Sequence, residues 1–542
     1  MSDWDYIVVG AGSAGCVLAN RLSADPFNRV LLLEAGSADR GARYKIVALS
    51  ATEAIGNPSS DWMMRTEPDP SRMNRIDSMP RGKALGGSSS INGTIYVRGN
   101  RGDYDHWAQL GCVGWDYDSL LKVFHRMEGA AADVRREGVY GETGPLTISR
   151  TRGPHPLARV FIDAIAELGA AENARYNREA RAGASITHVT QRGGWRWSSA
   201  DAYLRPAMHR ANLRVITGAL VRRIVFDGKR AAGVEYDQDG QSVTARCNGE
   251  VILSASAYNS PKLLMLSGVG DPEHLARHGI ATIRANPHVG RNLQEHPACM
   301  VKAYVRSRTS NMDGSGLGKL RQSLRFAFFR SGPATHVWPA IAFMKVRAEA
   351  EYPDLMFHFG AFVGDVTPDG FKLSDRPGIT VLPAVNRSRS RGYVALRSSD
   401  PLDSPVIQHN MLGDPHDLEV LVAGVRHARS ILHTRAFASE FKAEHVPGPG
   451  VVSDADLEHF VRATSTPGYH PCGTVKMGTD AAAVVNPRLR VIGVEGLRVI
   501  DSSIIPQIPS GNINAISLLI GEMGADALLA DQPWKQSIKR KD

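Results

Sequence analysis

A glycine-rich turn between two buried-strand patterns restricts the fold more than any other feature of this 542-residue chain. Residues 5–23 read DYIVVGAGSAGCVLANRLS, an apolar run followed by glycines and then by a helical pattern. Residues 29–36, RVLLLEAG, form a second short run, rich in Val and Leu, of the kind found in parallel sheets. The order strand, glycine turn, helix and strand predicts a βαβ unit at the N-terminus.

The spacing of the glycines in GAGSAG is typical of a dinucleotide site. Gly10 permits the tight turn, Gly12 lets the backbone approach a pyrophosphate, and Gly15 allows close packing of helix and strand. The helix N-terminus faces the phosphate charge, and Glu34 is placed to accept hydrogen bonds from a ribose diol. The motif alone does not separate FAD from NAD. The residues predicted to bind this half of the cofactor are Gly10, Gly12, Ser13, Ala14, Gly15, Glu34 and Ala35.

Cysteine usage and hydropathy exclude several classes of protein. The five cysteines are scattered and form no CxxC pair, which argues against a disulfide framework or a structural zinc site. No apolar run approaches the roughly 20 residues of a membrane-spanning helix, and the N-terminal residues lack the pattern of a signal peptide. We therefore expect a cytoplasmic protein without a transmembrane segment.

The positive charge of the chain is concentrated in one stretch. The formal net charge is +9. Residues 135–230 hold 17 Lys and Arg against 8 Asp and Glu. A nucleic-acid surface and an ordinary solvated face both have such a composition. The arginines are spread out and no recognition motif accompanies them, so we favour the solvated face and expect no nucleic-acid partner.

A glycine- and serine-rich stretch, RGKALGGSSSINGTIYVRG at 81–99, offers many backbone N–H groups and hydroxyls, as phosphates or a polar ring require. Four further stretches follow it. They are SASAYNSPKLLMLSGVG at 254–270, VGRNLQEHP at 289–297, GYHPCGTVKMG at 468–478 and LRVIDSSIIPQIPSGNINA at 497–515. In this order the five stretches resemble the glucose–methanol–choline (GMC) oxidoreductases, which bind FAD.

This resemblance implies a cofactor site along much of the chain. Gly87, Ser88, Asn92, Gly93 and Thr94 would lie along the flavin and its diphosphate. The resemblance places Val221 at the adenine and Asp501 at the diphosphate or ribityl chain, and it also counts Asn512 among the cofactor contacts. Some members hold FAD covalently through a histidine immediately before the position of Asn92. Ile91 stands there, so we expect non-covalent FAD.

The resemblance also implies the catalytic pair. Alcohol oxidation needs a base for the hydroxyl proton, and histidine suits this task because its pKa lies near neutrality. His470 matches the family's histidine, which acts as a base or stabilises an alkoxide. The second residue is a His or Asn six positions after a proline, which gives Asn512 after Pro506; Asn514 is the rival. The histidines show no metal-binding spacing such as HxxxH with a carboxylate, so we predict no metal.

The substrate pocket is expected around residues 333–343, PATHVWPAIAF. Family members that act on choline carry a glutamate near here that pairs with the ammonium, and its position corresponds to Pro339. Burying an unpaired cation is costly, so we predict that choline is a poor substrate. His336, Trp338 and Phe343 favour an aryl or apolar alcohol, although Trp338 is equally consistent with a core residue.

The predicted enzyme is an FAD-dependent alcohol dehydrogenase or oxidase that uses O2 or a quinone- or dye-like acceptor. Gly468 stands where some oxidases carry a larger residue, which favours a dehydrogenase. Two other activities on the same fold, a hydroxynitrile-type lyase and a light-driven decarboxylase, stay as alternatives. The decarboxylase needs a long apolar tunnel and a carboxylate-binding arginine. The sequence identifies neither of them.

For the architecture we predict an α/β protein with two interleaved domains. A Rossmann-like FAD-binding domain would comprise residues 1–150, 200–300 and 461–542. An α+β substrate domain on an antiparallel sheet would comprise residues 151–199 and 301–460. The loop-like segment 307–320 is a candidate lid over the site between them.

Overall fold

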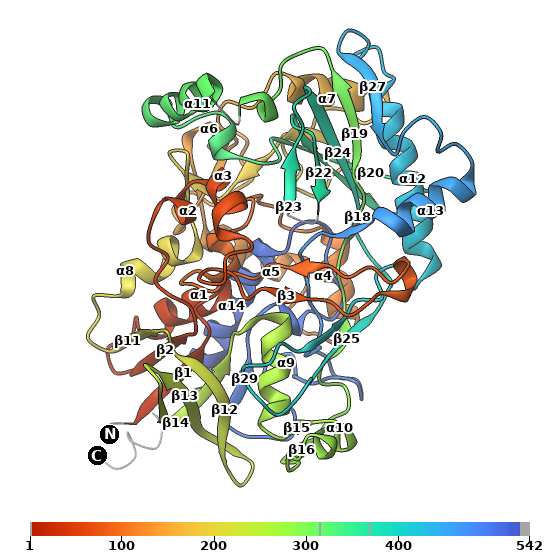
Figure 1. The fold of residues 1–542 in the computed structure, drawn as a ribbon. Coiled ribbons are helices and arrows are strands. Elements are labelled where there is room, and N and C mark those ends of the chain that lie inside the picture. Colours follow the sequence, from red (N-terminus) through yellow and green to blue (C-terminus); the bar gives the residue numbers. More distant parts are fainter. Residues whose placement is uncertain (1–2, 314–315, 368–369, 532–542) are drawn as a thin grey trace.

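The fold is built on two large sheets that lie one above the other in Figure 1. The structure is a computed structural model that describes residues 3–313, 316–367 and 370–531. The described ends of the chain both lie at the lower sheet in this view. Segments from the start, middle and end of the chain meet in that sheet, so the chain passes between the two sheets repeatedly.

The lower sheet has seven strands and a parallel core. The N-terminal βαβ unit forms as predicted, because β1 pairs in parallel with β2 and the glycine turn leads into helix α1 (Ser13–Leu22). The antiparallel strands β12 and β13 extend the sheet beyond β14. The strands are β11 (Leu213–Thr217), β2 (Val30–Glu34), β1 (Trp4–Val9), β14 (Gln241–Leu253), β13 (Arg230–Gln238), β12 (Leu220–Asp227) and β29 (Leu497–Val499), which pairs with β14.

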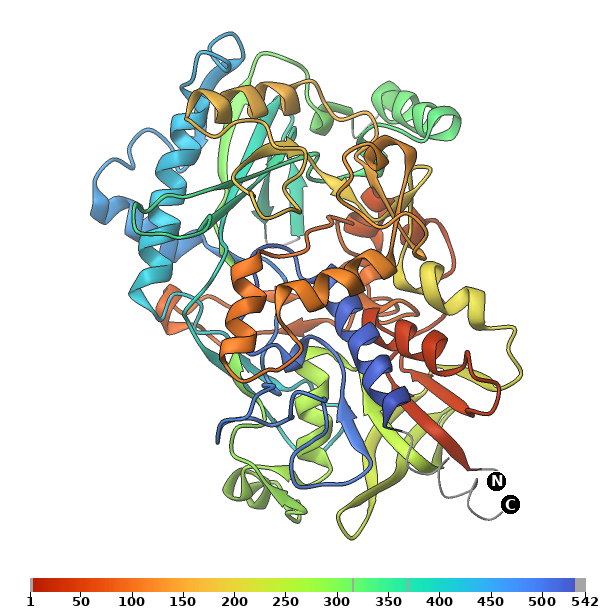
Figure 2. The same cartoon turned by 180° about the vertical axis from the view of Figure 1, so that it is seen from behind.

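Helix α14 (Asn514–Ala530) packs against α1 behind this sheet, as Figure 2 shows. The contact is close because Gly521 lies on Val17 and Ala14: an added Cβ would stand 2.9 Å from Val17 Cβ. The N-terminus of α14 thereby reaches the glycine turn, and Ser13 Oγ donates to Asn514 Oδ1 at 2.9 Å.

The upper sheet has eight strands and is antiparallel. Helices α7 (Leu157–Glu167), α12 (Pro415–Leu432) and α13 (Asp454–Thr464) pack with it around a second hydrophobic core. Its strands are β27 (Phe441–Val446), β19 (Val301–Val305), β24 (Gly378–Val385), β21 (Leu355–Gly360), β20 (Ala340–Met344), β7 (Gly183–Ile186), β18 (Pro297–Ala298) and β28 (Thr466–Pro467). The two sheets confirm the predicted fold class. The exact domain boundaries stay predictions, and β18 and β28 join this sheet although their segments were predicted for the other domain.

The expected loop at 307–320 is partly helical, which corrects the sequence-based interpretation. A 3-10 turn spans Ser310–Asp313, residues 314–315 lie outside the described residues, and helix α11 (Gly316–Phe329) follows. None of the described residues of this segment lines the central cavity, so a role as its lid has no support. Among the described residues, no helix combines the length and apolarity needed to cross a membrane.

Candidate active site

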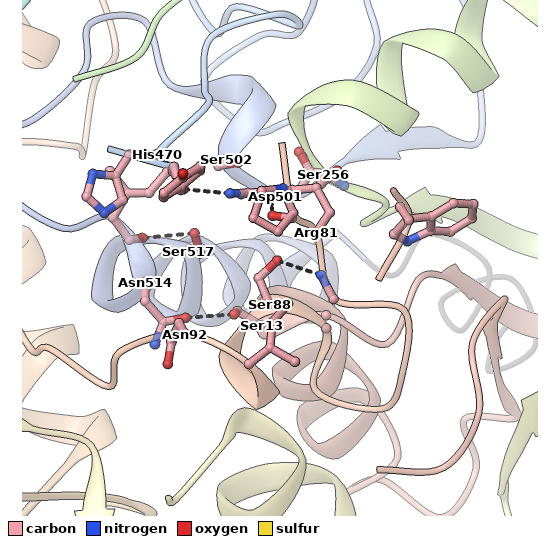
Figure 3. A pocket seen from close by; sticks show the side chains of 18 of the residues that line it. Ser13, Arg81, Ser88, Asn92, Ser256, His470, Asp501, Ser502, Asn514 and Ser517 are labelled. Atoms are coloured by element: carbon pink, nitrogen blue, oxygen red, sulfur yellow. Dashed lines mark hydrogen bonds between the residues drawn. The ribbon is translucent and has the colours of Figure 1, made fainter. Parts of the chain in front are cut away.

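A cavity of about 490 Å³ lies between the two sheets and is lined by residues from both. Figure 3 shows His470 and Asp501 along the upper side of the view and Ser13, Ser88 and Asn92 along the lower side. With one exception, Gly15, all the residues predicted to bind the cofactor line this cavity. The lining residues are Gly10, Gly12, Ser13, Ala14, Glu34, Ala35, Gly87, Ser88, Asn92, Gly93, Thr94, Val221, Asp501 and Asn512.

The glycine turn has the geometry that a dinucleotide requires. Gly10 has a φ of +100°, which a residue with a side chain rarely adopts. An added Cβ on Gly15 would lie 1.9 Å from the carbonyl oxygen of Gly10, so Gly15 serves close packing and not direct contact with the cavity. On Gly12, in contrast, an added Cβ would meet only the carbonyl oxygen of Ser254, at 3.9 Å. Gly12 therefore leaves open space beside the N-terminus of α1.

Glu34 ends β2 at the floor of the cavity. One carboxylate oxygen accepts a hydrogen bond from Ala11 N and the other from Gly36 N, both at 2.8 Å. Burial raises the pKa of Glu34 to about 7, while these two hydrogen bonds and Lys83 oppose the rise. Each oxygen keeps a lone pair that a ribose hydroxyl can use.

A buried arginine holds the glycine- and serine-rich loop against the cavity. Arg196 is 1% exposed and donates hydrogen bonds to Ser89 O at 3.1 Å, to Asn92 Oδ1 at 2.7 Å and to Ser50 Oγ at 2.9 Å. Burial lowers the pKa of Arg196 to about 9. No sequence pattern points to this arginine, because it lies about a hundred residues from the loop it supports.

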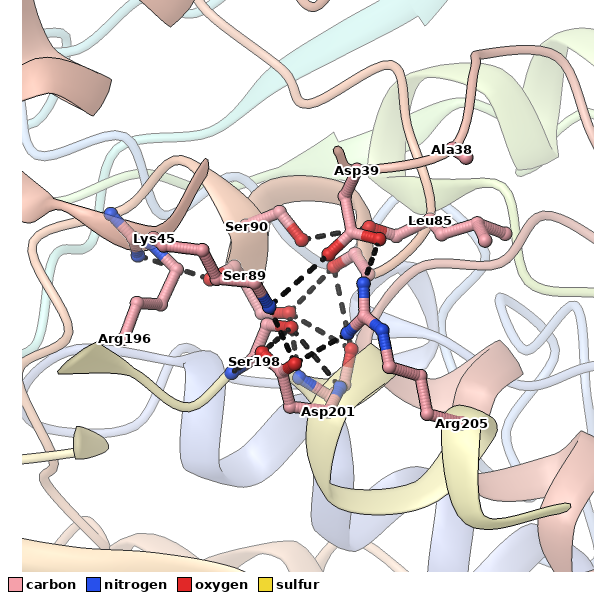
Figure 4. Close-up of polar contacts among 12 residues, drawn as sticks. Ala38, Asp39, Lys45, Leu85, Ser89, Ser90, Arg196, Ser198, Asp201 and Arg205 are labelled. Atoms are coloured by element: carbon pink, nitrogen blue, oxygen red, sulfur yellow. Dashed lines mark hydrogen bonds and ion pairs between the residues drawn. The ribbon is translucent and has the colours of Figure 1, made fainter. Parts of the chain in front are cut away.

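An ion-pair cluster lies beside the same loop, as Figure 4 shows. Arg205 pairs with Asp39 and Asp201, and Lys45 pairs with Asp201 at 2.5 Å. Arg196 and Arg205 belong to the basic stretch 135–230, and other arginines of that stretch, such as Arg159, also pair with carboxylates. Ion pairs within the fold therefore neutralise part of the local charge excess.

Asp501 follows β29, lines the cavity and links the start of helix α9 (Ser256–Leu266) to the turn Ser502–Ile504. Its carboxylate accepts hydrogen bonds from Ser256 N at 2.9 Å, Ser260 Oγ at 2.5 Å and Ser503 N at 2.8 Å. Burial raises the pKa of Asp501 above its ordinary value despite these bonds. Asp501 thus positions the backbone at the cavity as well as lining it.

His470 and Asn512 meet at the other end of the cavity. Asn512 Nδ2 lies 3.0 Å from His470 Nε2. Asn514, the rival from the sequence, instead accepts the hydrogen bond from Ser13 at the start of α14. Asn512 Oδ1 is buried and has no hydrogen-bond partner among the described residues, so it remains available to a ligand.

The hydrogen bonds of His296 determine which nitrogen of His470 carries the proton. His296 Nε2 lies 3.1 Å from Asn386 O and 3.2 Å from Pro509 O, so it must be the protonated nitrogen that donates to a carbonyl. Burial lowers the pKa of His296 to about 4, so its ring is neutral and Nδ1 is an acceptor. His470 Nδ1 lies 3.0 Å from that acceptor and must donate to it. His470 Nε2 is then unprotonated and faces Asn512.

Glu295 fixes the backbone of His470. Its carboxylate accepts hydrogen bonds from His470 N at 2.7 Å and from His296 N at 2.8 Å. Burial raises the pKa of Glu295 to about 7. Glu295, His296 and His470 also offer ligand atoms within 4.8 Å of one another, as a metal site would. The hydrogen bonds named above already use both histidine Nδ1 atoms and the carboxylate, so the trio works as a hydrogen-bonded network.

The turn that carries Asn512 rests on a second buried network. Ser510 donates to Asp103 through its backbone N at 2.8 Å and through its hydroxyl at 3.1 Å. Arg181, 2% exposed, donates to Ser510 O at 3.2 Å. An added Cβ on Gly511 would lie 2.4 Å from Val97 Cγ1, so the turn has no room for a side chain at this position.

His358 is a site residue that the sequence did not reveal. It lies on β21, lines the cavity and is 4% exposed. Neither of its ring nitrogens has a hydrogen-bond partner among the described residues. Burial lowers the pKa of His358 to about 4, and the Asn512 side chain opposes this shift. The neutral ring is therefore available to a bound substrate.

The structure corrects two of the three residues expected to form the substrate pocket. Trp338 lines the cavity, but His336 and Phe343 do not. His336 is buried, its Nδ1 lies 3.0 Å from Thr335 Oγ1, and burial lowers its pKa to about 3. Phe343 is fully buried, with the Arg181 guanidinium 4.1 Å above its ring. The wall near His470 is mostly apolar and comprises Ala298, Met300, Val337, Trp338, Met356, Leu382 and Ala384.

The arrangement fits FAD. A turn without side chains, a helix N-terminus and a carboxylate occupy one end of the cavity, as an ADP half requires. Hydroxyls and amides line its middle, and the orphaned Asn512 Oδ1 lies at the other end beside an unprotonated imidazole nitrogen. These residues would hold a dinucleotide with its ADP half at the glycine turn.

The pH dependence of catalysis should report the burial of His470. Burial, followed by the charges of His296, His358 and Arg81, holds its pKa well below the ordinary 6.5. A base must be neutral to act, so kcat/KM should stay level from about pH 7 to 9 and fall only as the pH drops below about 6.5. The measurement is a pH profile of kcat/KM for the best alcohol.

Glu295 provides the control for this profile. Its pKa of about 7 lies in the measured range, but its carboxylate contacts the backbone of His470 and not the ring. Glu295→Gln should remove any small step near pH 7 and leave the acid limb in place. An acid limb with an apparent pKa of 7 or above in both proteins would contradict the assignment of a buried neutral base.

Comparison with known proteins identifies the family. The family model described as GMC oxidoreductase matches residues 4–298 with its N-terminal part and residues 388–521 with its C-terminal part. An oxygen-dependent choline dehydrogenase from Brucella anthropi is 40% identical over 537 residues, which covers 98% of this chain and 97% of the relative.

Solved structures give the same result. A pyridoxine 4-oxidase from Mesorbium loti superposes with a TM-score of 0.87 at 30% identity, covering 97% of this chain and 99% of the other. A fungal aryl-alcohol oxidase superposes with a TM-score of 0.83 at 25% identity, covering 99% and 100% of the two chains. The similarity therefore extends over both sheets and the cavity between them.

Proposed function

The chain belongs to the GMC oxidoreductase family, and on that premise we propose that it oxidises an aryl or apolar primary alcohol to the aldehyde. It is an FAD-dependent enzyme, and FAD, when bound, supplies the acceptor for the hydride of the alcohol carbon. The observation that carries the proposal is the unprotonated His470 Nε2, 3.0 Å from Asn512 Nδ2 and facing the cavity.

In this proposal the alcohol oxygen binds between His470 and Asn512. The Asn512 amide donates a hydrogen bond to the oxygen, and His470 Nε2 takes the hydroxyl proton. The positive charge that forms on the His470 ring is stabilised by its Nδ1–H bond to His296. His358 offers a further polar contact that restricts the orientation of the substrate. Such fixed groups lower the barrier by positioning the reacting atoms.

The substrate class follows from the charges around the cavity. The carboxylates that line it are Glu34 and Asp501, and both belong to the cofactor half. No carboxylate among the described lining residues faces the apolar wall near His470 and Trp338. A buried ammonium would therefore have no anionic partner there, which is costly. This supports an uncharged alcohol, although the relatives at 40% identity are named as choline dehydrogenases.

The electron acceptor in our proposal is a quinone- or dye-like compound, with O2 as the alternative. Gly468 lines the cavity beside the catalytic histidine, where an added Cβ would stand 3.2 Å from His470 Nδ1 and 3.1 Å from His296 O. The histidine pair therefore leaves little room for a larger residue at this position. Readmission of air to the reduced enzyme distinguishes the two acceptors.

The substrate proposal is tested with choline and its uncharged isostere, 3,3-dimethylbutan-1-ol. The two alcohols have nearly the same shape, so the ammonium charge is the variable. We expect the neutral alcohol and benzyl alcohol to reduce the flavin anaerobically with a kcat/KM at least about tenfold above that of choline, because a lost ionic partner costs more than 1.4 kcal/mol. Bleaching of the oxidised flavin band measures each reaction.

Either of two outcomes would contradict the proposal. If choline reacts as efficiently as the best uncharged alcohol, the substrate class is wrong while the alcohol oxidation stands. If no alcohol bleaches the flavin of a protein that retains FAD, the lyase or decarboxylase alternative gains support.

A further inference from the structure

Helix α11 has its apolar face turned away from the protein. Leu317, Leu320, Leu324 and Phe328, here called the outer stripe, follow one another at helical spacing and share one face. They are 85%, 55%, 49% and 76% exposed, in this order. A soluble protein normally turns such a stripe inward, because exposed contiguous apolar surface is unfavourable. The outer stripe therefore indicates a surface that another apolar phase covers.

The opposite face of α11 anchors the helix to the protein. Phe326 is 6% exposed, and its ring meets the edge of Trp195 at a centroid distance of 4.9 Å. The Arg330 guanidinium lies over both rings, at 4.5 Å from Trp195 and 5.0 Å from Phe326. Gln322 donates to Asp313 at 2.7 Å. The orientation of the outer stripe is thus fixed by packing on the other side.

The charge of the helix is entirely positive. Residues 314–330 contain four cations, Lys319, Arg321, Arg325 and Arg330, and no Asp or Glu. None of the four forms an ion pair with a residue that the structure describes, and Lys319 and Arg321 are exposed. A second copy of the chain docked on this face would bring like charges together. A negatively charged surface with an apolar interior would instead complement both the cations and the outer stripe of the helix.

We propose that α11 binds the surface of a membrane that contains anionic lipid. The outer stripe enters the boundary between headgroups and acyl chains, while the positive charges of Lys319 and Arg321 attract the anionic headgroups. The helix is too short and too charged to span the bilayer, so it lies in the plane of the surface. Both overall views show α11 projecting at the edge of the molecule, where a flat surface can reach it (Figures 1 and 2). This inference does not depend on the proposed substrate.

Membrane binding at α11 would bring the lipid surface near the wall of the cavity. The short turn Pro333–Thr335 follows the helix, contacts α3 (Val47–Leu49) and leads to Val337 and Trp338 in the cavity wall. A membrane held at α11 therefore lies close to the segment that shapes the apolar end of the cavity. Apolar alcohols or acceptors dissolved in the lipid would be concentrated beside the enzyme.

The test is co-sedimentation of the holoenzyme with large vesicles of equimolar phosphatidylglycerol and phosphatidylcholine, compared with phosphatidylcholine alone. We expect at least about tenfold stronger binding to the anionic vesicles, and weakening of that binding in 500 mM salt. The double variant L324E/F328E should lose binding about tenfold or more, and K319E/R321E should lose the preference for anionic lipid. These side chains are exposed, so turnover of a soluble alcohol should be unchanged.

Phe27→Glu is the matched control, because Phe27 is an 83% exposed apolar residue away from α11. Its vesicle binding should equal that of the unaltered enzyme. Absence of binding to anionic vesicles, or equal binding of L324E/F328E, would overturn the proposal. A dimer in light scattering that L324E/F328E dissociates, without vesicle binding, would also overturn it and assign the outer stripe to contact between copies.

Discussion

Replacement of His470 with alanine is expected to slow flavin reduction by the alcohol about 10²- to 10⁴-fold, the usual contribution of a positioned general base. The physical reason is the loss of the unprotonated Nε2 that the His296 hydrogen bond maintains next to Asn512. The change removes about 3 to 5 kcal/mol of transition-state stabilisation. Anaerobic stopped-flow reduction at saturating alcohol measures the effect directly.

Two controls separate catalysis from structure in this experiment. FAD content and melting temperature should stay close to those of the unaltered enzyme, and added imidazole should restore part of the rate because the side chain leaves a cavity of its own shape. Asn512→Ala should also slow reduction, and the double variant H470A/N512A should be less impaired than the product of the single effects, since both groups act on one oxygen. Reduction of H470A within about threefold of normal would exclude His470 as the base.

Gly12→Ala is expected to yield a folded protein that has lost FAD. The backbone of Gly12 has a φ of −75°, and an added methyl would meet only Ser254 O at 3.9 Å, so the chain itself tolerates alanine. The methyl group would nevertheless enter the space beside the N-terminus of α1 where the pyrophosphate must approach. We expect the affinity for FAD to fall on the order of 10²-fold or more, because the backbone of this turn cannot move aside to restore close approach of the pyrophosphate. FAD titration of the apoprotein, followed by flavin fluorescence, measures the change.

Two other glycines serve as controls for Gly12→Ala. Gly15→Ala should fail to fold, because the added Cβ would lie 1.9 Å from Gly10 O within the backbone. Gly450→Ala should change neither folding nor FAD content, because an added Cβ there has no neighbour within 4 Å. Retention of normal FAD affinity by G12A would show that the cofactor does not approach this turn.

The cofactor half of the site was largely predictable from the sequence. The glycine turn and Glu34 lie within one βαβ unit, where local spacing determines geometry, and these residues line the cavity except for Gly15. His470 and Asn512 were found by resemblance to a family. The structure places Asn512 Nδ2 3.0 Å from His470 Nε2. Their roles stay proposals that the experiments above test.

The substrate half was not predictable in the same way. His336 and Phe343 lie in the expected segment but are buried outside the cavity, whereas Trp338 lines it. His358 stands in the unremarkable strand sequence LMFHFG, and only the pairing of β21 with β20 and β24 brings it to the cavity. A pocket wall assembled from neighbouring strands has no continuous signature along the chain.

The sequence by itself determined the dinucleotide turn and the family, and it placed His470 and Asn512 as the proposed catalytic pair. Only the tertiary structure decided which nitrogen of His470 is unprotonated, because that depends on carbonyl groups of Asn386 and Pro509 far along the chain. It also decided that the outer stripe of α11 faces solvent, since an amphipathic pattern does not say what covers its apolar side. Local spacing determines backbone conformation, whereas burial, proton placement and exposed surface depend on distant segments that meet only in the folded protein.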